Sequence, residues 1–370
     1  MNIVFYNLNF KNGGVEKFTI HLCNFFVSNR ITVKILIGSK NSNILKQASS
    51  ALRINAIGTS IFFVNLIVLF LYALINKTDV IFTDRYHSFV IAGFLKRCNL
   101  LKSDVYMILH SQLASAVGTA SMRSAKQAKR FKFLGNLIDS ASGVIAVSDG
   151  TLREFTELFP NYAGRKVVIK NPVFVEHIVT QATQPLSTKH LELFSRPGKK
   201  IISVGRLEAE KNFSLLLSAF SQILADSPAQ LIICGEGREH EKLEHLIKTL
   251  GLQDSVTLTG FVDNPYNLMA SSDLFVLSSN SEAFGIVLLE AMVTGLTIVA
   301  TDCPTYGPRE ILDNGQYGYL VNPDDADALA KAMIKALNQP VSQILLEKRL
   351  NEFSVADCAN KYLEFAGKLN

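Results

Sequence analysis

Short apolar runs alternate with longer helix-like segments along most of the chain, and this pattern predicts parallel β-sheets connected by helices. In the first half, the apolar runs predict strands at residues 3–8, 31–37, 80–83, 105–109 and 143–147, with a weaker strand near 53–57. The pattern stops over residues 174–198, whose Gln, Thr, Ser and two prolines are typical of a linker. It resumes with predicted strands at residues 201–204, 230–234, 256–259 and 274–277. We therefore expect an α/β protein with two domains.

Residues 273–312 form the segment around which the second domain is organised. Apolar residues 274–277 predict a short strand, and a polar turn follows it. Gly285 allows close approach of the backbone, and residues 286–293 are apolar on nearly every side, as in a helix that packs against a sheet. Gly295 suits the end of that helix. A second strand and loop follow, which completes a βαβ unit of a parallel sheet.

Two carboxylates frame this unit, Glu282 in the loop and Glu290 on the helix. Glu282 precedes a helix N-terminus, where it could act only as a cap. Glu290 lies among apolar neighbours, so its charge needs a partner. An ionised carboxylate can accept hydrogen bonds from two neighbouring sugar hydroxyls. Parallel sheets bind ligands at the carboxyl ends of their strands, so this pair suits a site for a polyol.

The same residues resemble a known signature. Glu282-Ala283-Phe284-Gly285, followed by Glu290, resembles the E-x7-E motif of retaining glycosyltransferases of family four (glycosyl transferases group 1), which have the GT-B fold. The flanking LLEAM and TDCPTYGPREI extend the resemblance. It implies two Rossmann-like parallel-sheet domains that face each other across a cleft. In that pattern the first domain spans residues 1–173, the second spans 199–354, and a C-terminal helix at about 355–370 crosses back to the first.

Arg206 and Lys211 follow the predicted strand at residues 201–204 on one loop. Two cations that converge there would neutralise a diphosphate, Arg as a planar fork and Lys as a point charge. The alternative is a solvated loop with two basic residues. The sequence GRL followed by EKN resembles the family's diphosphate-binding loop, which favours the first interpretation and includes Gly205.

Two further loops are candidates for binding the nucleotide. The glycines of Gly235-Glu236-Gly237-Arg238 would bring the backbone near a ligand, although the chain lacks the G-x-G-x-x-G dinucleotide motif here. At Gly260-Phe261-Val262 the resemblance places the nucleotide base against the backbone and an apolar side chain.

The N-terminal domain offers a Gly-Gly turn and a histidine. Residues 11–16 (KNGGVE) connect the first strand to a helix, so Gly14 could present bare N–H groups to a phosphate or an acceptor, or form only a tight turn. His110 follows a strand end, where a histidine is either structural or ligand-binding. The resemblance implies that His110 contacts the donor sugar near the reacting carbon, and it favours His110 over His87.

The resemblance implies transfer of a hexose or N-acetylhexosamine from a UDP- or GDP-sugar to a saccharide or lipid-linked saccharide, with retention at the anomeric carbon. Glu282 would bind the donor sugar and Glu290 the ribose. The expected catalytic residues are His110, Arg206, Lys211 and Glu282, and the expected donor-binding residues are Gly14, Gly205, Gly235, Glu236, Phe261, Val262, Ala283, Phe284, Gly285, Ile286 and Glu290. No D-x-D signature is present, so we expect no metal and no cofactor.

The T-D-C-P form at residues 301–304 resembles members that handle amino sugars in surface polysaccharide or lipopolysaccharide assembly. Two alternatives stay open at this point. One is a glycosidic phosphorylase on the same fold, which would need free phosphate and a pyridoxal cofactor. The other is a non-catalytic subunit that binds a sugar nucleotide.

Composition indicates an ordinary globular protein of the cytosol. The five cysteines are scattered without a C-x-x-C pair, which argues against a disulfide framework or a zinc site. The N-terminal MNIVFYNLNF lacks the features of a signal peptide. Residues 61–75 are apolar except for Asn65 and Tyr72, and they are too few to span a bilayer. We expect a helix packed inside the N-terminal domain, with a helix lying against a membrane as the alternative.

Charge divides unevenly between the halves. Residues 1–180 contain 21 Lys+Arg and 9 Asp+Glu, a net charge of +12, whereas the whole chain carries +5. Residues 114–133 are basic, with Arg123, Lys126, Lys129, Arg130 and Lys132. They form either a solvated helix face or a patch attracted to anionic phospholipid, and we favour the patch. No nucleic-acid motif accompanies them, so we expect no nucleic-acid partner. The expected location is the cytoplasm, with possible peripheral attachment to the inner face of the membrane.

Overall fold

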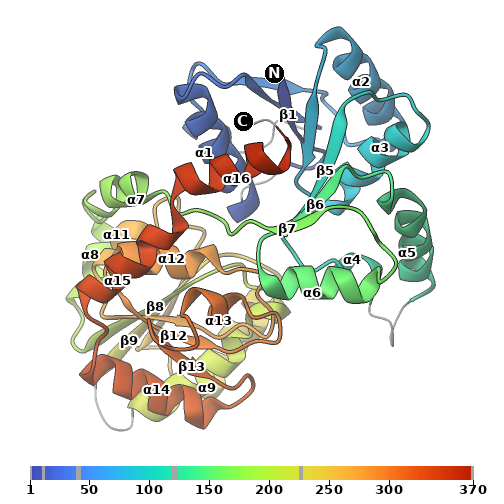
Figure 1. Cartoon of the computed structure of the whole chain (residues 1–370). Helices are drawn as coiled ribbons and strands as arrows, with labels where there is room; N and C mark the ends of the chain where they lie inside the picture. The colour runs from blue at the N-terminus through green and yellow to red at the C-terminus, as the bar shows by residue number, and fades with distance from the viewer. Residues whose placement is uncertain (1, 11–12, 39–42, 119–123, 225–227, 368–370) are drawn as a thin grey trace. The chain divides into compact units, whose positions relative to one another are not determined.

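A computed structural model describes residues 2–10, 13–38, 43–118, 124–224 and 228–367 of the chain. It divides into two compact units (Figure 1). Unit 1 comprises residues 1–172 and 355–370, and unit 2 comprises residues 173–354. Each unit has its own parallel sheet, so the predicted α/β fold with two Rossmann-like domains is confirmed. Arg123 of the predicted basic patch and residues 11–12 of the Gly-Gly loop lie outside the described residues.

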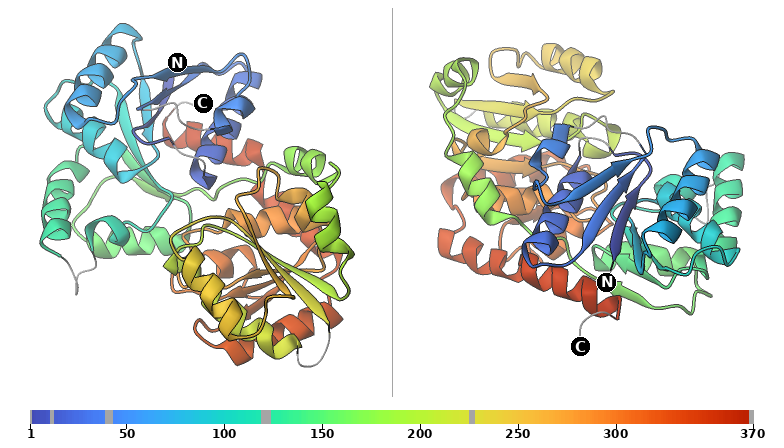
Figure 2. Two further views of the ribbon diagram at one scale, coloured as in Figure 1. Left: turned by 180° about the vertical axis from the view of Figure 1, so that it is seen from behind. Right: turned by 90° about the horizontal axis from the view of Figure 1, so that it is seen from above.

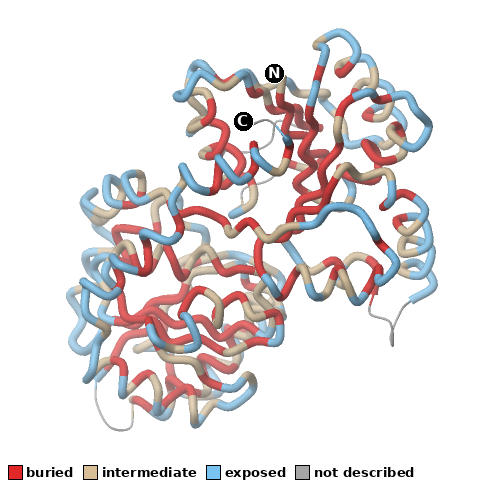
Figure 3. Tube along the Cα trace, viewed as in Figure 1, coloured by how far each residue is buried: buried red, intermediate tan, exposed pale blue. Residues whose placement is uncertain are grey.

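The described part of unit 1 contains a seven-stranded sheet in the order β3-β2-β1-β4-β5-β6-β7. Its strands β1, β4 and β6 are buried along their whole length, as expected for a parallel sheet covered on both faces (Figure 3). The strands are β1 (Ile3–Asn7), β2 (Val33–Ile37), β3 (Arg53–Ala56), β4 (Val80–Thr83), β5 (Asp104–Leu109), β6 (Gly143–Ala146) and β7 (Lys166–Val168).

Helices cover both faces of this sheet (Figures 1 and 2). They are α1 (Gly14–Ser28), η1 (Asn43–Gln47), α2 (Phe62–Ile75), α3 (Tyr86–Arg97), α4 (Ala114–Val117), α5 (Ala125–Ile138), α6 (Asp149–Leu158) and α16 (Val355–Phe365). Phe5 of β1 packs against Phe26 of α1 and Tyr362 of α16. Its neighbour Tyr6 contacts α2 from the opposite face. The C-terminal helix α16 is therefore part of the core of unit 1.

Helix α2 departs from the expectation that it packs inside the domain. Only three of its residues, Asn65, Leu69 and Ala73, are buried. Its opposite face is exposed, with Phe63 73% and Leu74 66% accessible. No helix in the described part of the chain is long and apolar enough to cross a membrane.

The described part of unit 2 contains a six-stranded sheet in the order β10-β9-β8-β11-β12-β13. The strands are β8 (Lys199–Val204), β9 (Ala229–Cys234), β10 (Val256–Gly260), β11 (Leu274–Leu277), β12 (Thr297–Thr301) and β13 (Tyr319–Val321). The helices are α7 (Val175–Ala182), α8 (Thr188–Ser195), η2 (Ala209–Lys211), α9 (Phe213–Leu224), α10 (His240–Thr249), α11 (Tyr266–Ala270), α12 (Ile286–Val293), α13 (Gly307–Ile311), α14 (Ala326–Asn338), α15 (Gln343–Leu350) and η3 (Asn351–Phe353).

Residues 174–198 carry the helices α7 and α8 and lie within unit 2. Side chains at the start of α11 hold this segment through its backbone. Asn264 Nδ2 donates to the carbonyl of Gln181 at 2.8 Å, and Asn267 Nδ2 donates to the carbonyl of Pro185 at 3.2 Å. The polar composition of the segment thus accompanies regular structure fixed by contacts distant in sequence.

Candidate functional site

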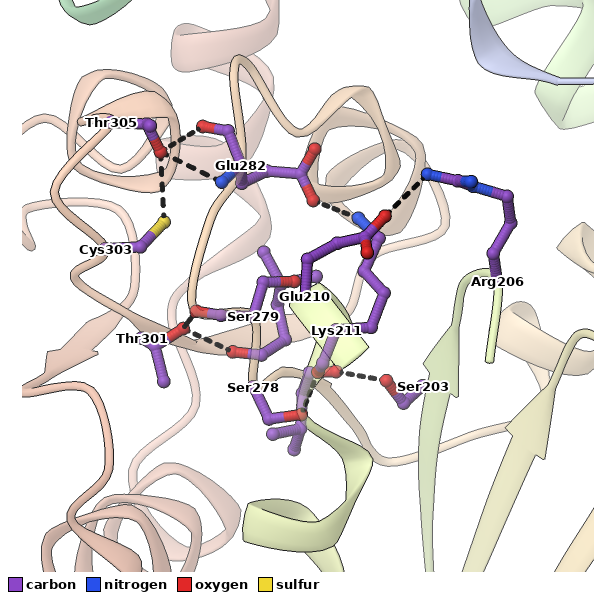
Figure 4. Close-up of polar contacts among 12 residues, drawn as sticks. Ser203, Arg206, Glu210, Lys211, Ser278, Ser279, Glu282, Thr301, Cys303 and Thr305 are labelled. Atoms are coloured by element: carbon purple, nitrogen blue, oxygen red, sulfur yellow. Dashed lines mark hydrogen bonds and ion pairs between the residues drawn. The ribbon is translucent and has the colours of Figure 1, made fainter. Parts of the chain in front are cut away.

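Two loops of unit 2 lie side by side because the strands that precede them are neighbours. Strands β8 and β11 pair in parallel, so their carboxyl ends lie at the same edge of the sheet. The backbone N–H of Asn280 donates to the carbonyl of Glu210 at 2.8 Å, and Ser278 Oγ donates to the carbonyl of Lys211 at 3.0 Å. The loop at 205–212 is thereby fastened to the loop that carries Glu282 (Figure 4).

Lys211 and Glu282 form an ion pair between these two loops. Each side chain is 16% accessible, so the pair is largely shielded from water. Asn212 follows Lys211 in the left-handed conformation, with φ 45°, and its side chain donates to Asn280 Oδ1 at 2.8 Å. This turn directs Lys211 toward the Glu282 loop.

Arg206 lies on the same loop but bonds to a different carboxylate. Its Nη2 donates to Glu210 Oε1 at 2.7 Å, and the Arg206 side chain is 69% accessible (Figure 4). The two predicted cations therefore each bond to a glutamate, Lys211 to Glu282 and Arg206 to Glu210. Because an exposed ion pair is weak, Arg206 is free to exchange Glu210 for an anionic ligand at little cost.

Helix α12 begins directly after the Glu282 loop without a side-chain cap. Gly285 is its N-cap residue, with φ 91° in the left-handed region, and no side chain in the described structure caps it. The N–H groups of the first turn, which starts at Ile286, can therefore bind an anion. Phe284 is buried and packs edge-on against Phe353, with ring centroids 6.0 Å apart, so it supports the loop from within.

Thr305 holds Glu282 in place, and the sequence analysis missed this role. Its Oγ1 accepts from the backbone N–H of Glu282 at 2.9 Å and donates to the Glu282 carbonyl at 2.8 Å (Figure 4). Gly307 packs so closely on this loop that a Cβ there would clash with the carbonyls of Glu282 and Phe284. The TDCPTYG segment therefore serves as the support on which the Glu282 loop rests.

Glu290 also has a partner that the sequence analysis missed. Tyr266, at the start of α11, donates from its hydroxyl to Glu290 Oε1 at 2.8 Å. Burial, and then the nearby Glu290 carboxylate, raise the pKa of Tyr266, so its hydroxyl keeps the proton that it donates. This bond satisfies one oxygen of the half-buried Glu290 carboxylate and fixes the direction of the Glu290 side chain.

The predicted glycines pack against one another. Gly235 has a φ of 150°, and a Cβ there would clash with the carbonyl of Gly205. The N–H of Gly205 donates to the carbonyl of Cys234 at 3.0 Å, and that of Leu207 donates to the carbonyl of Glu236 at 2.9 Å. Gly205 and Gly235 thus allow the loops after β8 and β9 to interlock.

Phe261 follows β10 at the same edge of the unit 2 sheet. Its side chain is 54% accessible, and its backbone N–H donates to Glu236 Oε1 at 3.4 Å. Val262, the next residue, is half-buried, as is Ala283 of the Glu282 loop. An exposed aromatic ring beside a glycine turn is suited to stack on a planar base.

His110 and Gly14 belong to unit 1. His110 follows β5, and both of its ring nitrogens are buried without a hydrogen-bond partner in the described structure. The ring of Phe18 packs edge-on against the imidazole, with ring centroids 4.8 Å apart. Burial, and then Arg85, lower its pKa to about 3, so the imidazole is neutral at pH 7. Gly14 is the exposed first residue of α1, whose first turn also contains the buried Glu16.

A buried acid lies near these residues. Asp84 follows β4 and is 1% accessible. Thr19 Oγ1 donates to its Oδ2 at 2.7 Å, and Arg85 pairs with Glu16 at 2.6 Å beside it. Burial raises the pKa of Asp84 to about 7, with a smaller contribution from Glu16. Among the described residues, no group of three or more His, Cys, Asp or Glu side chains could hold a metal ion.

The C-terminal part of the chain matches a known family. Residues 191–354 match the family model described as glycosyl transferases group 1. Over this segment, a little under half of the chain, the protein is similar to the glycosyl transferases group 1 family. The resemblance drawn from the E-x7-E motif, Glu282 to Glu290, is therefore confirmed.

Relatives of known activity match about half of the chain. A 4-alpha-N-acetylgalactosaminyltransferase of Campylobacter jejuni, named for its acceptor N-acetylgalactosamine-N,N'-diacetylbacillosaminyl-diphospho-undecaprenol, is 32% identical over 203 residues, which are 55% of this chain and 53% of that protein. The N-acetyl-alpha-D-glucosaminyl L-malate synthase of Bacillus anthracis is 31% identical over 203 residues, 54% of this chain and 51% of that protein. The match thus spans about half the length of these relatives.

Solved structures match the chain over its full length. Anabaena Alr3699/HepE in complex with UDP has a TM-score of 0.79 at 21% identity and covers 100% of both chains. Sucrose-phosphate synthase of Thermosynechococcus elongatus has a TM-score of 0.80 at 19% identity and covers 98% of both chains. These likenesses confirm the predicted GT-B fold.

The first prediction concerns the support of the Glu282 loop. Thr305→Val keeps the shape of the side chain but leaves the Glu282 N–H and carbonyl without their partner, which costs about 1–3 kcal/mol per unsatisfied buried group. We expect a lower midpoint of thermal unfolding for Thr305→Val and a midpoint close to wild type for Thr305→Ser. Equal midpoints for all three proteins would show that the hydroxyl does not hold the loop.

The second prediction follows from Asp84. Its pKa of about 7 in the folded state lies above the unfolded value of 3.8, so the folded state binds more protons between these values. The contribution of Asp84 to stability is therefore full below pH 4 and is lost as the pH rises through 7. We expect Asp84→Asn to gain thermal stability over wild type as the pH is raised from 5 to 8.

The control for this experiment is Asp139→Asn, at an exposed position of unit 1. The difference in thermal stability between this variant and wild type should stay constant over the same pH range. A constant difference for Asp84→Asn as well would mean that Asp84 is ionised throughout.

Proposed function

We propose that this protein is a retaining glycosyltransferase that moves a hexose or N-acetylhexosamine from a UDP- or GDP-sugar to a saccharide or lipid-linked saccharide. The observation that carries the proposal is the shielded ion pair of Lys211 and Glu282 beside the uncapped N-terminus of α12. This arrangement puts a cation, helix N–H groups and a hydroxyl-binding carboxylate at one strand edge. A sugar diphosphate has the complementary groups.

The cations Lys211 and Arg206 stabilise, in this proposal, the negative charge that develops on the leaving group. The bond between the anomeric carbon and the β-phosphate oxygen breaks, and negative charge grows on the diphosphate. Lys211 and the N–H groups that begin at Ile286 stabilise this charge, and Arg206 joins them when it leaves Glu210. Positive charge is thus supplied by the chain itself, so the proposed reaction is metal-independent.

In this proposal the configuration at the anomeric carbon is retained because the acceptor attacks the same face of the sugar that the diphosphate leaves. The acceptor oxygen bonds to the anomeric carbon, and its proton passes to the departing phosphate oxygen, so UDP or GDP is released. Glu282 accepts hydrogen bonds from donor-sugar hydroxyls and orients the sugar. His110, whose imidazole is neutral at pH 7, is assigned in this proposal to contact with the same sugar near the reacting carbon.

The nucleoside is bound by the outer part of the site. Glu290, held by Tyr266 through one oxygen, accepts from the ribose hydroxyls with its other oxygen. Phe261, beside Val262 and Gly260, stacks on the base.

The relatives support the class of donor and acceptor. The Campylobacter jejuni protein is named for transfer of an N-acetylhexosamine to a lipid-linked saccharide, and the Anabaena structure contains UDP. We extend these assignments to this chain as part of the proposal, together with a role in surface polysaccharide or lipopolysaccharide assembly. Release of free sugar from a panel of UDP- and GDP-sugars identifies the donor without knowledge of the acceptor.

The third prediction tests the leaving-group role. Lys211→Ala should lower the rate of donor turnover on the order of 10²–10³-fold, because one charge-stabilising donor is lost. The matched control is Lys242→Ala, which removes a lysine of unit 2 that also pairs with a glutamate, Glu239, but on the exposed helix α10. Circular dichroism should be near wild type for both variants. Wild-type turnover by Lys211→Ala would rule out the proposed role.

The fourth prediction tests the assignment of Glu290 to the ribose. Tyr266→Phe removes the hydroxyl that orients Glu290, so UDP should bind about fivefold more weakly, the effect of one hydrogen bond of about 1 kcal/mol. Binding of 2′,3′-dideoxy-UDP should not change, since that analogue lacks the hydroxyls. Tyr319→Phe, which removes a hydroxyl bonded to the Gln339 carbonyl, is the control. Equal loss for both ligands would assign Tyr266 a role in the fold alone.

A further inference from the structure

Helix α2 presents a continuous apolar face to the outside of unit 1. The exposed residues recur at helical spacing and include no polar or charged side chain: Phe63, Val64, Ile67, Leu71, Leu74 and Ile75. Figure 3 shows the exposed and intermediate colours along this helix. Single apolar residues on a surface are ordinary, but a contiguous apolar patch on a helix marks an interaction site.

The polar residues of the helix explain why this face points outward. Asn65 faces the sheet, where its Oδ1 accepts from the Tyr6 hydroxyl at 3.2 Å and its Nδ2 donates to the carbonyl of Thr59 at 2.8 Å. Tyr72 donates to Asn55 Oδ1 of β3 at 3.2 Å. Both polar side chains of the segment are thus used to attach α2 to the domain. The helix is the reverse of an ordinary amphipathic surface helix, which turns its polar side to water.

Cations lie on the same outer layer of the unit. Helix α3 packs between α2 and α5, and the three helices lie side by side on one face of the sheet (Figures 1 and 2). Lys126, Lys129 and Lys132 of α5 are exposed, and none of them forms an ion pair with a described residue. Phe133 of the same helix is 40% accessible. This layer therefore combines an apolar helix with a row of lysines whose charge is not neutralised.

We propose that this layer docks on the surface of an anionic lipid bilayer. Helix α2 lies in the plane of the interface with Phe63, Ile67, Leu71 and Leu74 in the acyl boundary, while the α5 lysines bind lipid headgroups. The 14 residues of α2 extend only about 21 Å, short of the ~30 Å hydrocarbon core, so the helix lies on the membrane rather than across it.

Charge favours a bilayer over a second copy of the chain. A second copy of the chain would bring another half with a net charge of +12 to this face, so the two copies would repel each other. An anionic bilayer offers both an apolar interior and negative headgroups. The docking does not depend on the proposed transferase activity, although a lipid-linked acceptor would be presented at the same surface.

Vesicle flotation of the full chain tests this inference. With phosphatidylcholine vesicles containing phosphatidylglycerol, we expect the wild-type protein to float with the lipid. The triple variant Phe63→Gln/Ile67→Gln/Leu74→Gln should partition at least ~100-fold less, because three large apolar side chains no longer leave water. The triple variant Lys126→Gln/Lys129→Gln/Lys132→Gln should partition onto anionic vesicles on the order of 100-fold less, at about fivefold per lysine. Its partitioning onto neutral vesicles should not change.

The matched control changes three exposed apolar residues of unit 2, Val179→Gln/Leu191→Gln/Ile344→Gln, and should float as the wild type does. UDP binding, measured in solution, should be the same for all of these proteins, so the test stands apart from that of the proposed function. Wild-type flotation by the α2 variant, or no flotation of the wild type, would overturn the docking. A wild-type dimer that becomes monomeric only in the α2 variant would instead assign the face to a second copy.

Discussion

The candidate site of unit 2 depends on the ion pair between Lys211 and Glu282, and the pair depends on the parallel register of β8 and β11. Because these strands are neighbours, their following loops meet at one edge, where backbone and side-chain bonds fasten Glu210 and Lys211 to the Glu282 loop. Neither charged group could be so shielded without the other, since a solitary buried charge is costly. The pair is thus both a structural element and a source of opposite charges for a polar ligand.

The fold was largely predictable because parallel strands are buried on both faces and appear in the sequence as short apolar runs. Two segments could not be predicted from sequence, and each has a physical reason. Residues 174–198 look like a linker by composition, yet Asn264 and Asn267, distant in sequence, hold its backbone against α11. Helix α2 is apolar on nearly every side, so periodicity carries no information on which face is buried. The bonds of its two polar side chains, Asn65 and Tyr72, decide the orientation.

The candidate site shows the same division between local and distant information. Motifs within one loop, such as those with Lys211 or Glu282, could be located from sequence because their residues are consecutive. Their partners could not, since Thr305 and Tyr266 reach the site from other elements and carry no signal of their own. Gly235 was predicted to bring the backbone near a ligand, and the structure shows that the neighbour it approaches closely is the backbone at Gly205.

The strand edges of the two units differ in their electrostatics. In unit 2 the groups are charged and paired, Lys211 with Glu282 and Arg206 with Glu210. In unit 1 burial disfavours charge: His110 is neutral, and Asp84 is about half protonated near pH 7. The same desolvation moves the two pKa values in opposite directions and in both cases favours the uncharged form.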